Sequence, residues 1–305
     1  MTPRIAVLVD RKEDWHARQL RAAFRRRGAD PVLLSLAACG FSLDSASGLD
    51  LPGFAGALPA AALVKTIAAG SFEQVTMRLG VLHALARAGV PVANDARAIE
   101  RCVDKSMTSF LLHRAGLPTP PTWTTEEPAV AAALVEREAK PGRPLVLKPL
   151  FGSQGRGLQL VETAADLPPA TAVDGVYYLQ RYVADPANGW RDWRVFVIDG
   201  KAVAAMIRHG VSWRTNAAQG ARCEGVAAIG ELAQLATGAA AATGAVYAGV
   251  DIIRDAAGGL QVLEVNSNPA WAALQRVSAI NIAQALADHL LALAAVARPA
   301  AAVTA

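Results

Sequence analysis

The sequence predicts a protein that combines two structural classes, an α/β region at residues 1–100 followed by a longer α+β region. In the first region short apolar strands alternate with helices, a pattern that favours a parallel sheet. In the second region apolar segments pair around glycine-rich or Asp-Gly turns, a pattern that favours antiparallel hairpins. The chain has 305 residues, which at roughly 150 residues per domain allows about two domains with substantial cores.

The elements expected in residues 1–100 follow the order of a parallel crossover. The apolar segment Ile5–Val9 is predicted to be a buried strand, and Asp14–Arg27 has apolar residues at helical spacing. Gly28 can end that helix, and Pro31–Leu36 is a second strand. The other elements expected here are a loop at residues 40–60, a short strand at 61–65 and a helix at 72–88.

A small antiparallel lid lobe is predicted at residues 101–180, and an α+β lobe at 181–296. The alanine-rich segment 297–305 is expected to be a disordered tail. The elements expected in the lid lobe are helices at 104–115 and 129–139, an extended connector at 117–123, and strands at 145–148, 158–161 and 177–183.

Composition and charge exclude several classes of protein. Hydrophobic residues make up 53% and charged residues 18%, so the chain is not disordered by composition. The net charge of +4 suits an anionic small molecule and is too weak to predict a nucleic-acid partner. Three distant cysteines, Cys39, Cys102 and Cys223, form no Cys-x-x-Cys pair. We therefore expect neither a disulfide framework nor a zinc site, and we expect a cytoplasmic location.

The mean hydropathy of +0.26 raises the question of a membrane segment. The longest uncharged stretch, Leu232–Val250, owes its apolarity largely to alanine. It is predicted to be a buried helix followed by a strand, because a spanning helix needs about 20 strongly apolar residues. The apolar run Ile5–Val9 is too short for the core of a signal peptide. No membrane partner is expected.

Lys148 ends a predicted strand directly before a glycine-rich stretch, residues 151–157. Glycines allow backbone N–H groups to approach an anion, and the lysine adds a point charge for phosphate. The stretch fits neither of the two common glycine-rich nucleotide patterns. An ordinary hairpin therefore remains an alternative.

Two carboxylates and an amide are expected to converge on two C-terminal strands, 250–254 and 260–266. Folding about residue 257 brings Asp251 within one position of Glu264, and Asn266 shares a face with Glu264. Hard oxygen ligands of this kind suit Mg²⁺. The alternative is that Asp251 and Asn266 serve only as turn caps.

Three arginines form another candidate set: Arg194, Arg208 and Arg214. The first two flank a hairpin whose turn is Asp199-Gly200. Strict pairing around a two-residue loop would place Arg208 on the opposite face from Arg194, whereas a bulge would place both on one face. The alternative is a solvated basic edge.

Ordered blocks of the sequence resemble the ATP-grasp superfamily, and specifically the RimK-type α-L-glutamate ligases. The blocks are Asp104-Lys105-Ser106, Val146–Pro149 with Gly152–Gly157, Leu179–Val183, Asp192-Trp193-Arg194, Ala205–Arg208, Arg214-Thr215-Asn216, Val250–Arg254 and Leu263–Pro269. The resemblance runs from about Val90 to Ala292, and residues 1–90 match the α/β domain that usually precedes it. It implies an ATP-grasp fold.

The resemblance also implies residue roles. ATP and Mg²⁺, with Mn²⁺ as an alternative, would lie between two lobes. Arg194 and Arg208 would hold the substrate carboxylate and its acyl-phosphate. The implied metal ligands are Asp251, Glu264 and Asn266. The implied nucleotide contacts are Lys105, Lys148, Gly152, Ser153, Gln154, Gly155, Gly157, the hinge Gln180, Arg181, Tyr182 and Val183, and Asp192, Arg214, Thr215 and Asn216.

The implied reaction joins a carboxylate to an amine. Phosphorylation by ATP gives the carboxylate a good leaving group, and an amine then displaces phosphate to form an amide. Two departures from the RimK pattern affect the acceptor and the hinge: Arg181 replaces an acidic residue, and the usual histidine and basic residue are missing after Asn216. The chain looks most like the branch that adds glutamate to tetrahydromethanopterin-type cofactors.

Other readings of the resemblance stay open at this stage. The acceptor could be a protein terminus or carrier protein, or the chain could be a non-catalytic ATP-binding regulator or a small-molecule kinase on the same fold. Small-molecule carboxylate and amine substrates, glutamate and a pterin among them, are the expected partners, with a homo-oligomer expected by resemblance. Replacing Asp251 or Glu264 with alanine is expected to abolish turnover and leave the fold largely intact.

Overall fold

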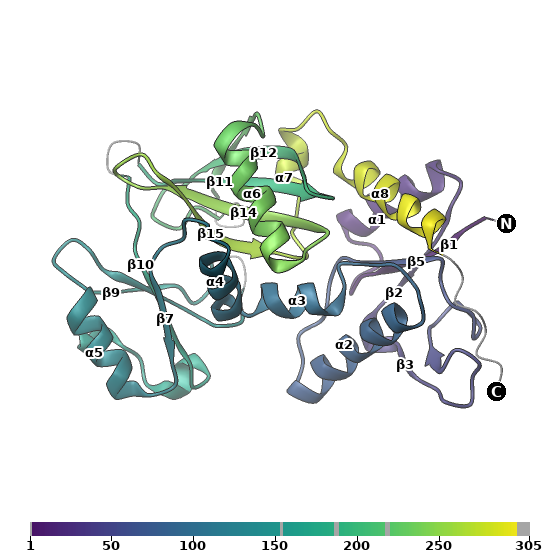
Figure 1. Cartoon of the computed structure of the whole chain (residues 1–305), viewed down its shortest axis with the longest axis horizontal. Coiled ribbons are helices and arrows are strands. Elements are labelled where there is room, and N and C mark those ends of the chain that lie inside the picture. Colours follow the sequence, from purple (N-terminus) through teal and green to yellow (C-terminus); the bar gives the residue numbers. More distant parts are fainter. Residues whose placement is uncertain (1, 153–154, 186–188, 217–219, 298–305) are drawn as a thin grey trace. The chain divides into compact units, whose positions relative to one another are not determined.

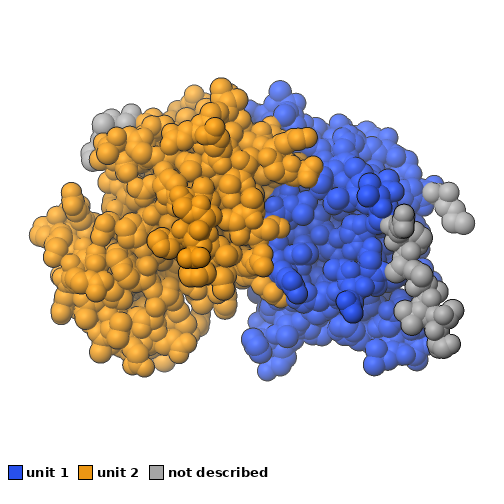
Figure 2. Space-filling view, in the orientation of Figure 1, with its two compact units in different colours: residues 1–99, 245–247, 268–305 blue, residues 100–244, 248–267 orange. Residues whose placement is uncertain are grey.

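A computed structural model describes residues 2–152, 155–185, 189–216 and 220–297. The predicted loop residues Ser153 and Gln154, and the predicted tail after Ala297, lie outside the described residues. The chain forms two compact units, coloured separately in Figure 2. Unit 1 comprises residues 1–99, 245–247 and 268–305, and unit 2 comprises 100–244 and 248–267. This division differs from the predicted consecutive ranges, because the segment after residue 267 joins unit 1.

Unit 1 is built on a four-stranded parallel sheet in the order β2-β1-β5-β6 (Figure 1). β1 (Arg4–Leu8) pairs in parallel with β2 (Asp30–Leu34) and with β5 (Ala61–Val64), and β5 pairs with β6 (Val92–Ala93). The parallel sheet predicted for the first hundred residues is confirmed. The predicted loop at 40–60 contains the short strands β3 (Gly40–Phe41) and β4 (Leu49–Asp50), and η1 (Leu36–Ala38) precedes them.

Helices cover both faces of this sheet, with α1 (Trp15–Arg26) and α8 (Ile282–Val296) on one side and α2 (Phe72–Arg87) on the other (Figure 1). α1 begins where the Asp14 carboxylate accepts a hydrogen bond from the backbone N–H of Ala17, at 2.6 Å. α2 begins with a capping box. Its buried residues join those of β1 and β5 in one apolar core. The short helix α7 (Ala272–Arg276) precedes α8.

The lid lobe of unit 2 is a four-stranded antiparallel sheet in the order β7-β10-β8-β9. Its strands are β7 (Thr122–Thr125), β10 (Tyr177–Arg181), β8 (Leu145–Lys148) and β9 (Gln159–Val161). Helix α5 (Pro128–Glu138) packs Leu134 and Val135 onto Leu147 and Leu179 of this sheet. The predicted antiparallel lobe is confirmed. The other elements are α3 (Ala96–Val103), which spans the boundary of the two units, α4 (Lys105–Arg114), η2 (Ala164–Asp166) and η3 (Ala170–Val173).

The second sheet of unit 2 has five strands in the order β13-β12-β11-β14-β15. They are β13 (Arg222–Val226), β12 (Lys201–His209), β11 (Arg191–Ile198), β14 (Tyr247–Arg254) and β15 (Leu260–Asn266). The uncharged stretch at 232–250 forms most of α6 (Gly230–Thr243) and the start of β14, as predicted. In the described part of the chain, no helix combines the length and apolar character needed to cross a membrane.

Two bulges set which side chains share a face of this sheet. Asp199 and Gly200 form the turn between β11 and β12, both with positive φ. The register then shifts: Val197 pairs with Ala202 but Phe196 pairs with Ala204, so Val203 is the extra residue. As a result Arg208 lies opposite Asp192 and shares a face with Arg194.

The second bulge lies between β14 and β15. Ile252 pairs with Val262 and Asp251 pairs with Glu264, so Leu263 is the extra residue. Without it, Asp251 would lie opposite residue 263 and Glu264 would point to the other face. The bulge therefore places Asp251, Glu264 and Asn266 on one face of the sheet.

Candidate active site

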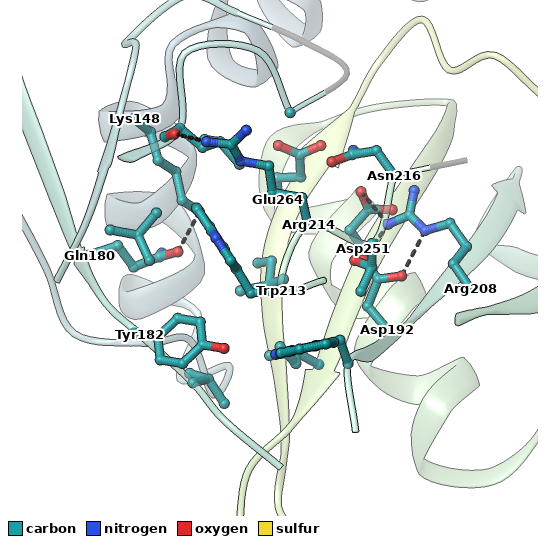
Figure 3. Close-up of a pocket in the computed structure, with 18 of the residues that line it drawn as sticks. Lys148, Gln180, Tyr182, Asp192, Arg208, Trp213, Arg214, Asn216, Asp251 and Glu264 are labelled. Atoms are coloured by element: carbon teal, nitrogen blue, oxygen red, sulfur yellow. Dashed lines mark hydrogen bonds and ion pairs between the residues drawn. The ribbon is translucent and has the colours of Figure 1, made fainter. Parts of the chain in front are cut away.

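A cavity of about 330 Å³ in unit 2 is lined by residues of both sheets (Figure 3). It gathers most of the predicted site residues from segments that are far apart in the sequence. Those that line it are Lys105, Lys148, Gly152, Gly155, Gln180, Arg181, Tyr182, Val183, Asp192, Arg208, Arg214, Thr215, Asn216, Asp251 and Glu264. Figure 3 shows Lys148 and Gln180 on one side of the cavity and Asp192, Arg208 and Asp251 on the other.

The lid side of the cavity carries two lysines. Lys148 ends β8, and its Nζ donates a 2.5 Å hydrogen bond to Oε1 of Gln180 on the paired strand β10. Burial lowers the pKa of Lys148 to about 8. Lys105, in the first turn of α4, donates to the carbonyl oxygens of Leu150 and Gly152, at 3.2 and 3.0 Å. Burial lowers its pKa as well. Both ammonium groups are thus placed at the start of the glycine-rich loop.

The opposite side carries a buried cluster of two carboxylates and two guanidinium groups. Arg194 donates to both oxygens of Asp251 at 2.6 Å. Arg208 donates to both oxygens of Asp192, at 2.6 and 2.5 Å, and its Nη2 lies 3.0 Å from Asp251. The Thr215 hydroxyl donates to Asp192 at 2.7 Å. Each arginine therefore holds a carboxylate in a two-pronged, charge-assisted arrangement.

Burial and mutual ion pairing shift the pKa values of the groups in this cluster. Burial acts to raise the pKa of Asp251, but Arg194 and Arg208 lower it to about 2. Burial raises the pKa of Asp192 despite its bond to Arg208. Burial alone would lower the pKa of Arg208, but Asp251 and Asp192 raise it above its ordinary value. Asp251 and Arg208 are therefore charged at neutral pH.

The predicted metal ligands differ in how many hydrogen bonds from other side chains their oxygens already accept. Asp251 accepts hydrogen bonds from arginines, whereas Glu264 is 30% exposed at its side chain and accepts at Oε1 from the Asn266 amide, at 2.9 Å. None of the described residues donates a hydrogen bond to Glu264 Oε2. Two carboxylates and an amide oxygen on one face fit a hard cation such as Mg²⁺. In the described ranges no cluster of three or more His, Cys, Asp or Glu side chains is arranged as a metal site.

The hinge end of the cavity is aromatic. Tyr182 meets Trp213 edge-on, with ring centroids 6.2 Å apart. The Arg214 guanidinium lies 5.0 Å from the centroid of the Trp213 ring and donates to the Leu158 carbonyl at 2.6 Å. Arg181, which replaces the acidic residue of the RimK pattern, donates to Glu138 at 2.7 Å. The Arg181 guanidinium is therefore held by helix α5.

Among the predicted site residues that the structure describes, three do not line the cavity. Arg194 and Asn266 instead contact residues that do line it, Asp251 and Glu264, respectively. Gly157 has a φ of +71°, and a Cβ there would lie 2.7 Å from Pro149, so this position of the loop requires glycine.

The cavity also contains residues that the motifs did not indicate. Trp213 adjoins the Arg214-Thr215-Asn216 block, and an aromatic residue in a polar loop is the signal that could have revealed it. Ile253 and Leu263 lie in two of the blocks that carry the resemblance, but their apolar side chains gave no reason to assign them a role. The other lining residues outside the predicted set are Val146, Pro149, Arg156, Leu158, Ala184, Asp185, Gly189, Trp190 and Arg191.

Comparisons with known proteins agree with this architecture. The tetrahydromethanopterin:alpha-L-glutamate ligase of Methanococcus maripaludis is 33% identical over 298 residues, which are 93% of this chain and 97% of that protein. The protein of the same name from Methanosarcina acetivorans is 30% identical over 325 residues, covering 94% of this chain and 98% of that protein.

Among solved structures, the ATP-grasp ligase PsnB in complex with a minimal precursor, Mg and ADP has a TM-score of 0.71 at 23% identity, covering 96% of this chain and 98% of that chain. This likeness shows the fold. The profile of the RimK-like ATP-grasp domain matches residues 102–290. The chain therefore belongs to the RimK-like ATP-grasp family.

Proposed function

We propose that this protein is an ATP-dependent carboxylate–amine ligase that adds L-glutamate to a tetrahydromethanopterin-type pterin. The observation that carries the proposal is one cavity with two lysines on one side and acidic oxygen donors on the other. That combination suits a polyphosphate together with a divalent cation. Relatives named tetrahydromethanopterin:alpha-L-glutamate ligase, similar over nearly the whole chain, support the choice of amino acid and acceptor.

In this proposal ATP lies along the cavity from the hinge to the carboxylates. Tyr182 and Trp213 offer an apolar edge for adenine, and the backbone of residues 180–183 supplies polar groups. Lys148 and Lys105 neutralise phosphate oxygens, and the glycine-rich loop that Lys105 contacts adds backbone N–H groups. The Arg214–Leu158 bond joins the loop after β12 to the end of the glycine-rich segment. That bond would help exclude water from a reactive intermediate.

A divalent cation, Mg²⁺ or Mn²⁺, would be held by Glu264 and Asn266 with Asp251 beside them. When bound, such an ion neutralises charge on the phosphoryl group that is transferred. Glu264 offers the freer carboxylate oxygen, whereas Asp251 keeps Arg194 and Arg208 in place. The chain itself therefore supplies a network of ion pairs between these carboxylates and guanidinium groups, which is present without any ligand.

The proposed reaction has two steps. The acceptor carboxylate takes the γ-phosphoryl group of ATP, which forms an acyl-phosphate and releases ADP. The α-amine of glutamate then attacks the carbonyl carbon, loses a proton and expels inorganic phosphate, leaving an amide. Arg208, which lines the cavity, would stabilise negative charge on the oxygens of both steps, and Arg194 would orient it through their shared partner Asp251.

The direct test measures phosphate release from ATP and Mg²⁺ with glutamate, screening pterin acceptors beside a protein extract, with mass spectrometry of the products. We expect phosphate release only when glutamate and a pterin are both present, and a pterin heavier by one or more glutamyl units. Glutamyl gain on a protein would move the acceptor to a protein terminus or carrier. Tight ATP binding without turnover would favour a regulator, and a phosphorylated product without an amide would favour a kinase.

We also propose a location, partners and an oligomeric state for the enzyme. A cytoplasmic location is proposed, and the three free cysteines support it. Small molecules are the proposed partners, with no nucleic acid and no membrane. A homo-oligomer is proposed by resemblance to RimK-type enzymes, and light scattering of the purified chain would test it.

The pKa of Lys148 makes ATP binding dependent on pH. Because burial lowers this pKa from 10.5 to about 8, the unliganded site loses its proton as the pH rises above 8. Phosphate oxygens favour the charged form, so ATP binding should take up a proton at about pH 8–9, and affinity should fall as the pH rises further. The unliganded protein should instead gain stability from pH 8 to 10.5, because its folded state holds fewer protons than the unfolded state there.

Calorimetry in buffers of different ionisation enthalpy measures this proton uptake. Lys148→Met should weaken ATP binding about 10- to 100-fold and abolish the uptake. The matched control is Lys201→Met, which removes an exposed lysine at the start of β12. Unchanged ATP affinity in Lys148→Met would contradict the assignment.

A further inference from the structure

Unit 1 has a feature of its own that the ATP cavity does not use, at the carboxyl edge of its parallel sheet. In the strand order β2-β1-β5-β6, the chain leaves β1 toward β2 and later returns to the other side of β1 as β5 (Figure 1). The order of strands therefore reverses between β1 and β5. In open parallel sheets, ligands bind outside the carboxyl ends of the strands at such a point.

Hydrogen bonds join the ends of these two strands closely. The N–H groups of Lys65 and Thr66 donate to the Leu8 carbonyl, at 2.8 and 3.2 Å, and the N–H of Asp10 donates to the Thr66 hydroxyl at 2.7 Å. Lys65 directly follows β5, so its side chain starts from the switch point itself.

Lys65 is a buried cation with most of its hydrogen-bonding capacity unused. The residue is only 4% exposed. Among the described residues, its Nζ donates a single hydrogen bond, a long one of 3.5 Å to the Asn268 carbonyl. No described carboxylate lies within ion-pair distance of it, and its Nζ lies 5.3 Å from the centroid of the Trp271 ring. An ammonium group has three donors, and leaving them unsatisfied in a buried place is costly.

The groups around Lys65 narrow the class of ligand. His16, in the first turn of α1, accepts at Nε2 a hydrogen bond from the backbone N–H of Trp271, at 3.1 Å. Burial and the charge of Lys65 lower the pKa of His16 to about 4, so this imidazole is neutral. The twelve-residue helix α1 also begins at this edge, and its N-terminus favours an anion.

Two acidic side chains near Lys65, Asp10 and Asp14, limit how much negative charge a ligand there can carry. Burial lowers the pKa of Lys65 to about 8, and Asp14 and Asp10 act in the opposite direction. One oxygen of Asp14 is used as the cap of α1. Two nearby carboxylates would repel a polyphosphate, whereas a single carboxylate could be held by Lys65 alone.

We propose that Lys65 forms a subsite in unit 1 that binds a carboxylate group of a substrate. The inference rests on the proposed function, because the ligand would be glutamate or the carboxylate-bearing acceptor of that reaction. The subsite is distinct in residues from the ATP cavity, whose lining residues all belong to unit 2. Asn268, whose carbonyl Lys65 contacts, follows the proposed metal ligand Asn266 by two residues in the sequence.

The test compares the full-length protein with Lys65→Met, Lys65→Arg and the control Lys201→Met. Calorimetry measures the affinities for L-glutamate, for the pterin acceptor and for ATP, and thermal unfolding confirms that each variant folds. We expect Lys65→Met to weaken binding of glutamate or of the acceptor about 10- to 100-fold. Its ATP affinity should stay unchanged, Lys65→Arg should restore part of the lost affinity, and Lys201→Met should behave as the parent protein.

The substrate whose affinity falls identifies the source of the carboxylate. Unchanged affinity for both substrates would overturn the subsite, as would an equal loss of ATP affinity or a parent protein that binds neither carboxylate substrate. Failure of the proposed function looks different. If the parent protein makes no glutamyl product but binds glutamate in a way that Lys65→Met abolishes, the proposed function fails and the subsite stands. If Lys65→Met does not fold, the same comparison is made with Lys65→Gln, which keeps a polar side chain of similar length.

Discussion

Replacing Glu264 with glutamine should lower the rate of ATP-dependent amide formation about 10²- to 10³-fold and leave the folded state nearly as stable as the parent. Glu264 faces the cavity, and none of the described residues donates to its Oε2. Glutamine keeps the size of the side chain and an acceptor for the Asn266 amide, but it removes the charge that would hold a cation. The loss should therefore appear in kcat/KM and not in the free energy of unfolding.

Steady-state kinetics with Mg²⁺ varied at fixed ATP measures this effect directly. Glu264→Gln should also raise the Mg²⁺ concentration needed for half-maximal rate. Glu136→Gln is the matched control, because it makes the same chemical change on the exposed face of α5. A Glu264→Gln variant with near-parental kcat/KM would show that Glu264 is not a ligand of the cation.

Replacing Asp251 with alanine should destabilise the protein by about 3–5 kcal/mol, in addition to abolishing activity. Asp251 is 3% exposed. It accepts hydrogen bonds from Arg194 and forms an ion pair with Arg208. Its removal leaves Arg194, already largely buried, without its bidentate partner. The sequence alone predicted an intact fold for this variant, and the buried ion pairs change that expectation.

Urea unfolding followed by circular dichroism measures this loss, again with Glu136→Gln as the control. The pH dependence provides a second check. Because the pKa of Asp251 is lowered from 3.8 to about 2, its contribution is fully present above pH 3.8 and is lost as the pH falls toward 2. The stability gap between the parent and Asp251→Asn should narrow over that window. A gap that is small at neutral pH, or independent of pH, would be evidence against the pairing.

Much of the secondary structure of this chain could be predicted from its sequence. Apolar runs bounded by glycine, proline and Asp-Gly turns predicted most strands of the two sheets of unit 2 within a few residues of their observed ends. β7 begins in what was expected to be an extended connector, and β13 was not predicted. Helix starts were marked by residues such as Asp14 and Ser71, whose side chains cap α1 and α2. These signals are local, so tertiary contacts were not needed to interpret them.

The division of the chain into its two compact units could not be predicted from the sequence. Residues 245–247 and 268–297 belong to the same unit as the N-terminal sheet, although about 150 residues separate them from it in sequence. Helix α8 is apolar along most of its length, and nothing in its sequence says which sheet it covers. The pairing of Asp192 with Arg208 and of Asp251 with Arg194 was equally hidden, because the motifs had assigned these residues separate roles.

The sequence by itself determined the family, the order of most strands and helices, and the residue types that meet in the cavity. The sequence left open whether Arg208 shares a face with Arg194 and whether Glu264 lies opposite Asp251, and the tertiary structure decided both. Side chains alternate along a strand with a period of two, so one extra residue moves every later side chain to the other face. Val203 and Leu263 are the extra residues that bring Arg208 beside Arg194 and Glu264 opposite Asp251. A bulge depends on how two strands pair, and pairing is a property of the folded sheet.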